Sequence, residues 1–211
     1  MFDLKNIEQN GVIPVATVKD ALQAEPLAKA LQAAGVNIIE ITFRTESAGY
    51  VIKQITAAFR QTVVCAGTVR TIEQVDIAMS AGAKFIISPG LSLKIAQYCR
   101  DNDILLIPGC ATPSEMQAAL EMGFNTVKFF PAEAMGGAKY INAVSAAFSG
   151  LSFIPTGGIN AENIAGYAKL KNVFACGLSG VCSSDLIAKN DFSQIEELTK
   201  NAKAAFFSNK K

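Results

Sequence analysis

The chain has 211 residues, of which 50% are hydrophobic, and this length suits one large domain or two small ones. Its formal net charge is +1 and its charged residues are scattered, so it carries no electrostatic footprint for nucleic acid. The absence of histidine excludes Ser/His and Cys/His nucleophile pairs and the usual imidazole zinc sites. Acid–base chemistry near neutral pH therefore falls to a carboxylate, a lysine, a tyrosine or a thiol.

The sequence also indicates in which cellular compartment the protein is located. Residues 1–8 are too polar for a signal peptide, and no apolar run approaches the length that spans a membrane. The five cysteines are an odd number and include no CxxC pair, so we expect no disulfide framework. These features predict a soluble, cytoplasmic protein without a membrane partner.

Short β-rich runs alternate with longer helical runs along the chain. The expected strands are Gly11–Val18, Asn37–Phe43, Val63–Val69, Phe85–Pro89, Ile104–Gly109, Thr126–Pro131, Ser152–Gly157 and Asn172–Gly177. Between them, three glycines stand where a helix should end and the next strand begin: Gly35, Gly82 and Gly123. Thr71 and Thr112 are typical of the cap residues that begin helices.

The expected strands carry few charges, which is typical of parallel strands covered on both faces. Eight βα units without a linker predict an α/β chain folded as a single-domain (β/α)8 TIM barrel that spans residues 1–211. An open doubly wound sheet is the alternative. It is weakened because no GxGxxG or P-loop motif follows the first strand.

The apolar run Thr126–Pro131 contains a lysine, Lys128, between a valine and two phenylalanines. Burying an ammonium is costly unless a partner or a chemical task compensates. In a strand, Lys128 and Phe130 share one face and Phe129 lies on the other. A lysine without water gives up its proton more readily, and the neutral amine attacks carbonyl groups to form a Schiff base. The alternative is a lysine at a strand end whose ammonium reaches water or a carboxylate.

Other notable residues fall at the carboxyl ends of the expected strands, which converge on one pocket in a barrel. They are Glu40, Arg44, Thr68, Pro89, Phe130, Thr156, Gly157, Gly158 and Ser179. In the simpler interpretation Glu40 is only an ion-pair partner of Lys128, and Arg44 is a surface residue. Thr68 and Ser179 would then be helix caps, and the glycines would only form a turn. All these coincidences would have to hold together, so one shared site is the better interpretation.

Five segments at these positions resemble, in order, the motifs of the bacterial 2-keto-3-deoxy-6-phosphogluconate (KDPG) aldolase / 4-hydroxy-2-oxoglutarate (KHG) aldolase family. They are Glu40–Thr45, Ala66–Val69, Ser88–Gly90, Val127–Glu133 and Pro155–Ile159. The resemblance spans nearly the whole chain. It implies a (β/α)8 barrel that is a class I aldolase, a carbon–carbon lyase. It also implies a homotrimer that needs neither metal nor cofactor.

The resemblance implies a role for each residue of the site. Lys128 forms the Schiff base with the keto acid, and Glu40 is the general acid and base. Arg44 and Thr68 hold the substrate carboxylate. The implied reaction cleaves KDPG to pyruvate and glyceraldehyde 3-phosphate in the Entner–Doudoroff pathway, with KHG, cleaved to pyruvate and glyoxylate, as an additional substrate.

The remaining residues would surround the rest of the substrate. By the same resemblance, Pro89, Phe130 and Thr156 shape the pocket, while the Gly157–Gly158 turn and Ser179 receive the phosphate. Glycine suits this role because its N–H group is unobstructed by a side chain.

One stretch departs from the family pattern of Gly-Gly-Ser followed by a bulky residue. This chain has Leu178 before Ser179, and residues 181–186 resemble the translation of a sequencing adaptor. A leucine side chain there stands where the backbone should approach a phosphate closely. One alternative is therefore a catalytically impaired keto-acid- or phosphate-binding barrel. A metal-dependent aldolase is the other alternative, which the lack of histidine disfavours.

Overall fold

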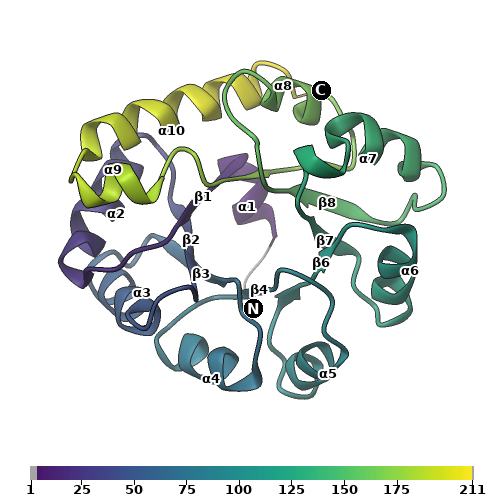
Figure 1. Ribbon diagram of the computed structural model, residues 1–211, viewed down its shortest axis with the longest axis horizontal. Helices are drawn as coiled ribbons and strands as arrows, with labels where there is room; N and C mark the ends of the chain where they lie inside the picture. Colours follow the sequence, from purple (N-terminus) through teal and green to yellow (C-terminus); the bar gives the residue numbers. More distant parts are fainter. Residues whose placement is uncertain (1–3, 211) are drawn as a thin grey trace.

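Strands and helices alternate in the computed structural model, which describes residues 4–210. The strands are β1 (Val12–Ala16), β2 (Ile38–Thr42), β3 (Val63–Gly67), β4 (Ile86–Ile87), β5 (Leu106–Ile107), β6 (Gly109–Cys110), β7 (Thr126–Phe129), β8 (Ser152–Pro155) and β9 (Cys176–Leu178). The α-helices are α1 (Lys5–Asn10), α2 (Ala24–Ala33), α3 (Ala48–Ala58), α4 (Ile72–Ser80), α5 (Leu93–Asp101), α6 (Pro113–Glu121), α7 (Gly137–Ser145), α8 (Ile164–Ala168), α9 (Ser184–Ala188) and α10 (Phe192–Phe207). Two short 3-10 helices, η1 (Ala21–Gln23) and η2 (Glu133–Met135), precede α2 and α7. The strands lie inside a ring of helices (Figure 1).

The expectation of a closed (β/α)8 TIM barrel is wrong. The strands within residues 4–210 form two parallel sheets, one of six strands in the order β5-β4-β3-β2-β1-β9 and one of three in the order β6-β7-β8. The fifth expected strand is divided between the sheets at Pro108, which has no N–H group to continue a ladder. Between β8 and β9 there are only isolated bridges, one of them from Thr156 to Gly177. There the chain turns away at Gly157 and Gly158, whose φ angles are 106° and 78°.

Local sequence explains where several helices begin and end. Thr71 caps α4 through its side chain, and Thr112 forms a capping box at the start of α6, with Pro113 in the first helical position. The three glycines predicted to end helices, Gly35, Gly82 and Gly123, all have positive φ angles. These local predictions are confirmed.

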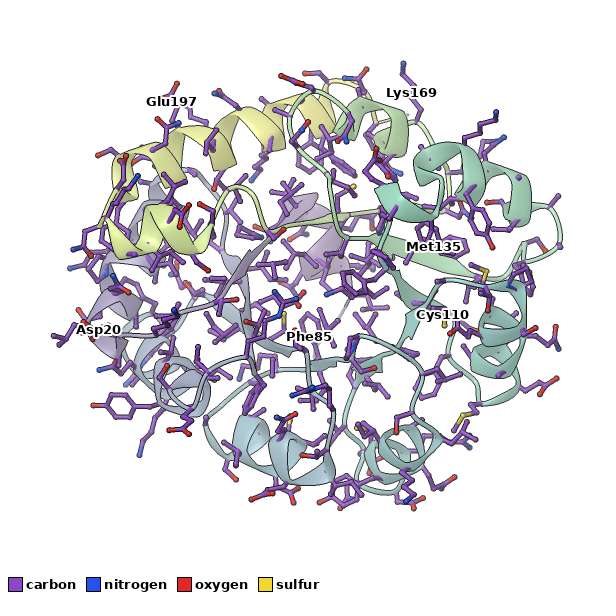
Figure 2. All side chains as sticks on the ribbon, viewed as in Figure 1. Asp20, Phe85, Cys110, Met135, Lys169 and Glu197 are labelled. Carbon is purple, nitrogen blue, oxygen red and sulfur yellow. The ribbon has the colours of Figure 1, made fainter. Side chains whose placement is uncertain are left out.

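The buried apolar side chains form one hydrophobic cluster between the strands and the surrounding helices. Figure 2 shows Phe85, which is fully buried, near the middle of the molecule, whereas Asp20, Lys169 and Glu197 lie on its rim. The buried polar and charged residues are Glu40, Thr42, Thr62, Ser88, Lys128, Thr156 and Thr199. Glu40 and Lys128, the charged residues among them, both belong to the expected site, and buried charges need a partner or a task.

The helix α1 lies at the amino-terminal end of the strands, because it directly precedes β1, and Figure 1 draws it in the middle of the ring. Its Ile7 is fully buried in the core. The loops at the opposite, carboxyl-terminal end of the strands remain for binding and chemistry. None of the helices within residues 4–210 has the length and hydropathy that a membrane crossing requires.

Candidate active site

Lys128 and Glu40 form a buried ion pair between β7 and β2. The Lys128 Nζ donates to Glu40 Oε1 at 2.9 Å and to Oε2 at 3.3 Å. The two residues are only 5% and 1% exposed. Strand alternation turns Lys128 inward, because the neighbouring Phe129 points outward and stacks on Tyr140 of α7 with ring centroids 5.4 Å apart. The amine is therefore kept dry and within reach of the Glu40 carboxylate.

The Lys128–Glu40 pair is poorly explained as a stabilising contact. Removing two charges from water costs several kcal/mol per ion, and well-packed apolar residues in place of a buried pair are often neutral or stabilising. Removing only one partner, by contrast, lowers the free energy of unfolding by about 3–5 kcal/mol, because the other charge stays buried and unpaired. A chemical task explains the pair better than fold stability does.

Gly67, at the end of β3, provides the space that the Glu40 carboxylate occupies. A Cβ atom placed on Gly67 would lie 2.0 Å from Glu40 Oε1 and 2.5 Å from its Cδ. Any larger residue there would displace the carboxylate. Glycine at position 67 is therefore required for the observed contact with Lys128.

The variant Gly67→Ala should lower kcat by about 10²-fold, because a displacement of about 1 Å near the chemistry can cost that much. Steady-state kinetics and the melting temperature measured together separate this effect from unfolding. Gly150→Ala is the matched control, since a Cβ there meets nothing within 4 Å. A Gly67→Ala protein with wild-type kcat would show that the position of Glu40 does not matter.

Cys65 is the neighbour of Glu40 on β3, where the two residues are Cα partners. Its thiol donates to the carbonyl of Ile39 at 3.4 Å. Burial, and then the negative charge of Glu40, raises the pKa of Cys65 well above its usual range. The thiol stays protonated and does not compete with Lys128 as a nucleophile.

Phe130 lies beside the lysine, and Pro89 lies against the neighbouring strand β6. The Lys128 Nζ is 5.6 Å from the centroid of the Phe130 ring, a cation–π contact. Gly109 is the Cα partner of Lys128 on β6, and a Cβ on Gly109 would lie 2.3 Å from the carbonyl oxygen of Pro89. The chain at Pro89 thus passes directly against the strand next to Lys128.

The turn after β8 reaches the same region. A Cβ on Gly157 would lie 3.5 Å from the Phe130 ring, so this turn borders the ring that contacts Lys128. Thr156 is 4% exposed, and a Cβ on Gly177 would lie 2.3 Å from its hydroxyl oxygen. Phe130 thus contacts Lys128 and borders the turn at Gly157, and Thr156 directly precedes that turn.

The Gly157–Gly158 turn uses its carbonyl groups, but not its two N–H groups, in hydrogen bonds to neighbouring loops. The carbonyl of Gly157 accepts a bond from the N–H of Glu133 at 3.1 Å, and that of Gly158 accepts one from Asn163 Nδ2 at 2.9 Å. Neither N–H donates in the turn, loop and cap hydrogen bonds within residues 4–210. Successive free N–H groups in such a turn can bind an anion.

Arg44, Thr68 and Ser179 lie at strand ends but farther into solvent. Arg44 follows β2 in an exposed turn and lines a cavity of about 470 Å³ with residues of α3 and α4. No hydrogen bond or ion pair within residues 4–210 joins its guanidinium to Glu40. Thr68 is half-buried, with a positive φ of 55°, which is strained for threonine. Ser179 is exposed, while Leu178 before it is fully buried.

Sequence reasoning missed four residues near the site: Thr17, Gly67, Glu133 and Tyr167. The hydroxyl oxygens of Thr17 and Thr42 lie 2.8 Å apart between the ends of β1 and β2. Glu133 accepts a hydrogen bond from the Tyr167 hydroxyl. Gly67 and Glu133 stand inside recognised motifs, but no pattern in the sequence marks Thr17 or Tyr167.

No group of three or more Cys, Asp or Glu side chains within residues 4–210 is arranged to hold a metal ion. A dry amine beside a carboxylate, inside parallel strands, is suited to Schiff-base chemistry on carbonyl compounds. The fold and the site thus define a lysine-based enzyme of α/β structure.

Comparison with known proteins gives the reaction class. The family model "KDPG and KHG aldolase" matches residues 4–198. The chain is 40% identical over 194 residues to the 2-dehydro-3-deoxy-phosphogluconate aldolase of Treponema pallidum, covering 92% of each chain. The protein is a carbon–carbon lyase of the aldolase class, and it belongs to the KDPG and KHG aldolase family.

Two crystal structures of such aldolases have closely similar folds. The KDPG aldolase of Legionella pneumophila, with pyruvate captured as a covalent carbinolamine intermediate, superimposes with a TM-score of 0.89 at 38% identity. That match covers 92% of this chain and 95% of the other. The Zymomonas mobilis enzyme with 3-phosphoglycerate also gives 0.89, at 33% identity, covering 96% of this chain and 95% of that one.

Proposed function

We propose that the protein cleaves KDPG to pyruvate and glyceraldehyde 3-phosphate through a Schiff base on Lys128, and that KHG is an additional substrate. The observation that carries this proposal is the 2.9 Å contact of a buried Lys128 Nζ with Glu40. Family membership and the covalent pyruvate intermediate of the Legionella relative support it.

The contact between Lys128 and Glu40 prepares the first step. In a dry site the lysine proton can pass to the carboxylate, which leaves a neutral amine and a carboxylic acid. The amine adds to the C2 carbonyl of the substrate. Loss of one water molecule, with protons supplied by Glu40, then gives a protonated imine.

Bond cleavage uses the same two groups. The Glu40 carboxylate takes the proton of the C4 hydroxyl as the C3–C4 bond breaks, and the bonding electrons move into the protonated imine to give an enamine. The aldehyde leaves. Return of the proton to C3 gives the imine of pyruvate, which one water molecule hydrolyses to pyruvate and free Lys128.

The remaining site residues are proposed to orient the substrate. Arg44 suits the C1 carboxylate because its planar fork can bind both oxygens, and Thr68 adds a hydroxyl. Pro89, Phe130 and Thr156 shape the apolar part of the pocket. The free N–H groups of the Gly157–Gly158 turn, with Ser179, would receive the phosphate.

Pyruvate release from KDPG and from KHG, each measured by coupling to lactate dehydrogenase, tests the proposed function. We expect turnover of KDPG that a chelator leaves unchanged. Loss of activity with the chelator would instead indicate a metal-dependent aldolase. Thermal stabilisation by pyruvate or phosphate without turnover of either keto acid would contradict the proposal.

The altered stretch at Leu178 is the basis of one alternative, an impaired phosphate site. An impaired phosphate site should lower the turnover of KDPG and leave that of KHG unchanged, because only KDPG carries a phosphate. The Leu178 side chain is fully buried while Ser179 remains exposed, which supports a working phosphate site. Comparable kcat/KM for the two substrates would count against a functional preference for phosphate.

We also propose that the protein works in the cytoplasm as a homotrimer, on the strength of its family membership. Sedimentation velocity at micromolar concentration should give a single species of three chains. A monomer over that range would contradict the trimer.

A further inference from the structure

Glu133 and Tyr167 connect the two loops that flank the proposed site. Glu133 begins η2, just after the residues that follow the lysine strand β7. Tyr167 lies in α8, beyond the Gly157–Gly158 turn, and is 1% exposed. Its hydroxyl donates a hydrogen bond to Glu133 Oε1. The contact joins segments 34 residues apart.

Glu133 also contacts the Gly157–Gly158 turn directly. Its N–H donates to the carbonyl of Gly157 at 3.1 Å. Its Cβ and Cγ each lie 2.8 Å from the position that a Cβ would take on Gly158. The main chain and the side chain of Glu133 thus both fix this turn.

Glu133 is an exposed residue, but its acceptor oxygen lies against the start of α7. A Cβ on Gly137 would lie 2.9 Å from Glu133 Oε1 and 3.1 Å from the Tyr167 hydroxyl. Burial, followed by the hydrogen bond to Glu133, raises the pKa of Tyr167 above its usual range. At neutral pH the hydroxyl therefore keeps its proton and remains a donor.

We propose that Glu133, held by Tyr167, is a positioning residue for the phosphate end of the substrate. It fixes the free N–H groups of the Gly157–Gly158 turn relative to Lys128, so that a substrate held at both ends is aligned for cleavage. Glu133 acts through this turn and not by touching the reacting atoms. The inference rests on the phosphate role proposed above for the turn.

Tyr167→Phe tests the proposal because it removes the donor and keeps the ring. We expect the KM for KDPG to rise about tenfold, the usual effect of losing a hydrogen bond to a charged group. The kcat for KDPG and the kcat/KM for KHG should stay within about twofold of wild type. Glu133→Ala should behave like Tyr167→Phe. Glu133→Gln should restore the wild-type KM, because its amide oxygen can still accept the bond.

Tyr98→Phe is the matched control. The Tyr98 hydroxyl donates to Asp76 in a tyrosine–carboxylate pair of the same kind, between α5 and α4. Its loss should leave the kinetics on both substrates unchanged. An equal loss on KDPG and KHG in Tyr167→Phe would indicate a merely structural role and overturn the proposal. So would an unchanged KM for KDPG.

Binding of inorganic phosphate separates this inference from the aldolase proposal, because it needs no turnover. The measurement is the rise in melting temperature with phosphate, compared with chloride at equal ionic strength. Weaker stabilisation of Tyr167→Phe than of wild type supports the positioning role, even if no keto acid is cleaved. Equal stabilisation of the two proteins, or none of the wild type, overturns it.

Discussion

Lys128→Met is expected to lower kcat/KM for KDPG by at least about 10⁵-fold, because the side chain that forms the covalent electron sink is gone. Methionine keeps an unbranched chain of similar volume and removes only the amine. Coupled detection of pyruvate measures the loss. Lys139→Met, which removes an exposed lysine from α7, is the matched control and should retain full activity.

A second variant keeps this result interpretable. Lys128→Met leaves Glu40 buried without its partner, at an expected cost of about 3–5 kcal/mol in unfolding free energy. Adding Glu40→Gln removes the isolated charge and should recover most of that stability without recovering activity. Urea unfolding measures the first effect and turnover the second. Activity of Lys128→Met within about tenfold of wild type would exclude Lys128 as the nucleophile.

Glu40→Gln is expected to lower kcat by about 10²–10⁴-fold, the usual contribution of general acid–base catalysis. The amide oxygen can still accept a bond from Lys128, but it cannot carry a proton between the C4 hydroxyl and C3. Exchange of the methyl protons of pyruvate with deuterated solvent, followed by NMR, reports the same proton transfer without any aldehyde. We expect cleavage and exchange to fall together.

Pyruvate binding separates this role from a structural one. In Glu40→Gln the concentration of pyruvate that gives half-maximal exchange should change much less than the exchange rate. Glu121→Gln, which alters an exposed carboxylate on α6, should leave both unchanged. A wild-type exchange rate in Glu40→Gln would mean that another group moves the proton.

The sequence predicts the fold well where the signal is local. Thr112 and Gly123 mark the two ends of α6, because a cap and a left-handed turn each depend on one side chain. Sheet closure depends on which strands pair, and this has no local signal. The run containing Pro108 has the pattern of one strand, yet it contributes β5 to one sheet and β6 to the other. The predicted closed barrel failed at that proline and at the Gly157–Gly158 turn.

In the candidate site, too, the residues with a local sequence signal were predicted and those set by tertiary contacts were not. Lys128 and Glu40 are conspicuous because each interrupts an apolar strand, where a charge needs a reason. The alternation that relates Glu40 to Arg44 stops with β2 at Thr42, so Arg44 lies in an exposed turn. Tyr167 looks like an ordinary core aromatic until its hydroxyl is placed against Glu133. A tertiary contact of this kind leaves no periodic trace in the sequence.

The most direct test of the account is to trap the imine itself. Incubation of the protein with pyruvate and borohydride, followed by proteolysis and mass spectrometry, should give one reduced adduct, on Lys128. The same treatment without pyruvate should give none. A protein that stays unmodified, or that carries its adduct on a different lysine, would contradict the claim that a dry amine beside Glu40 is the catalyst.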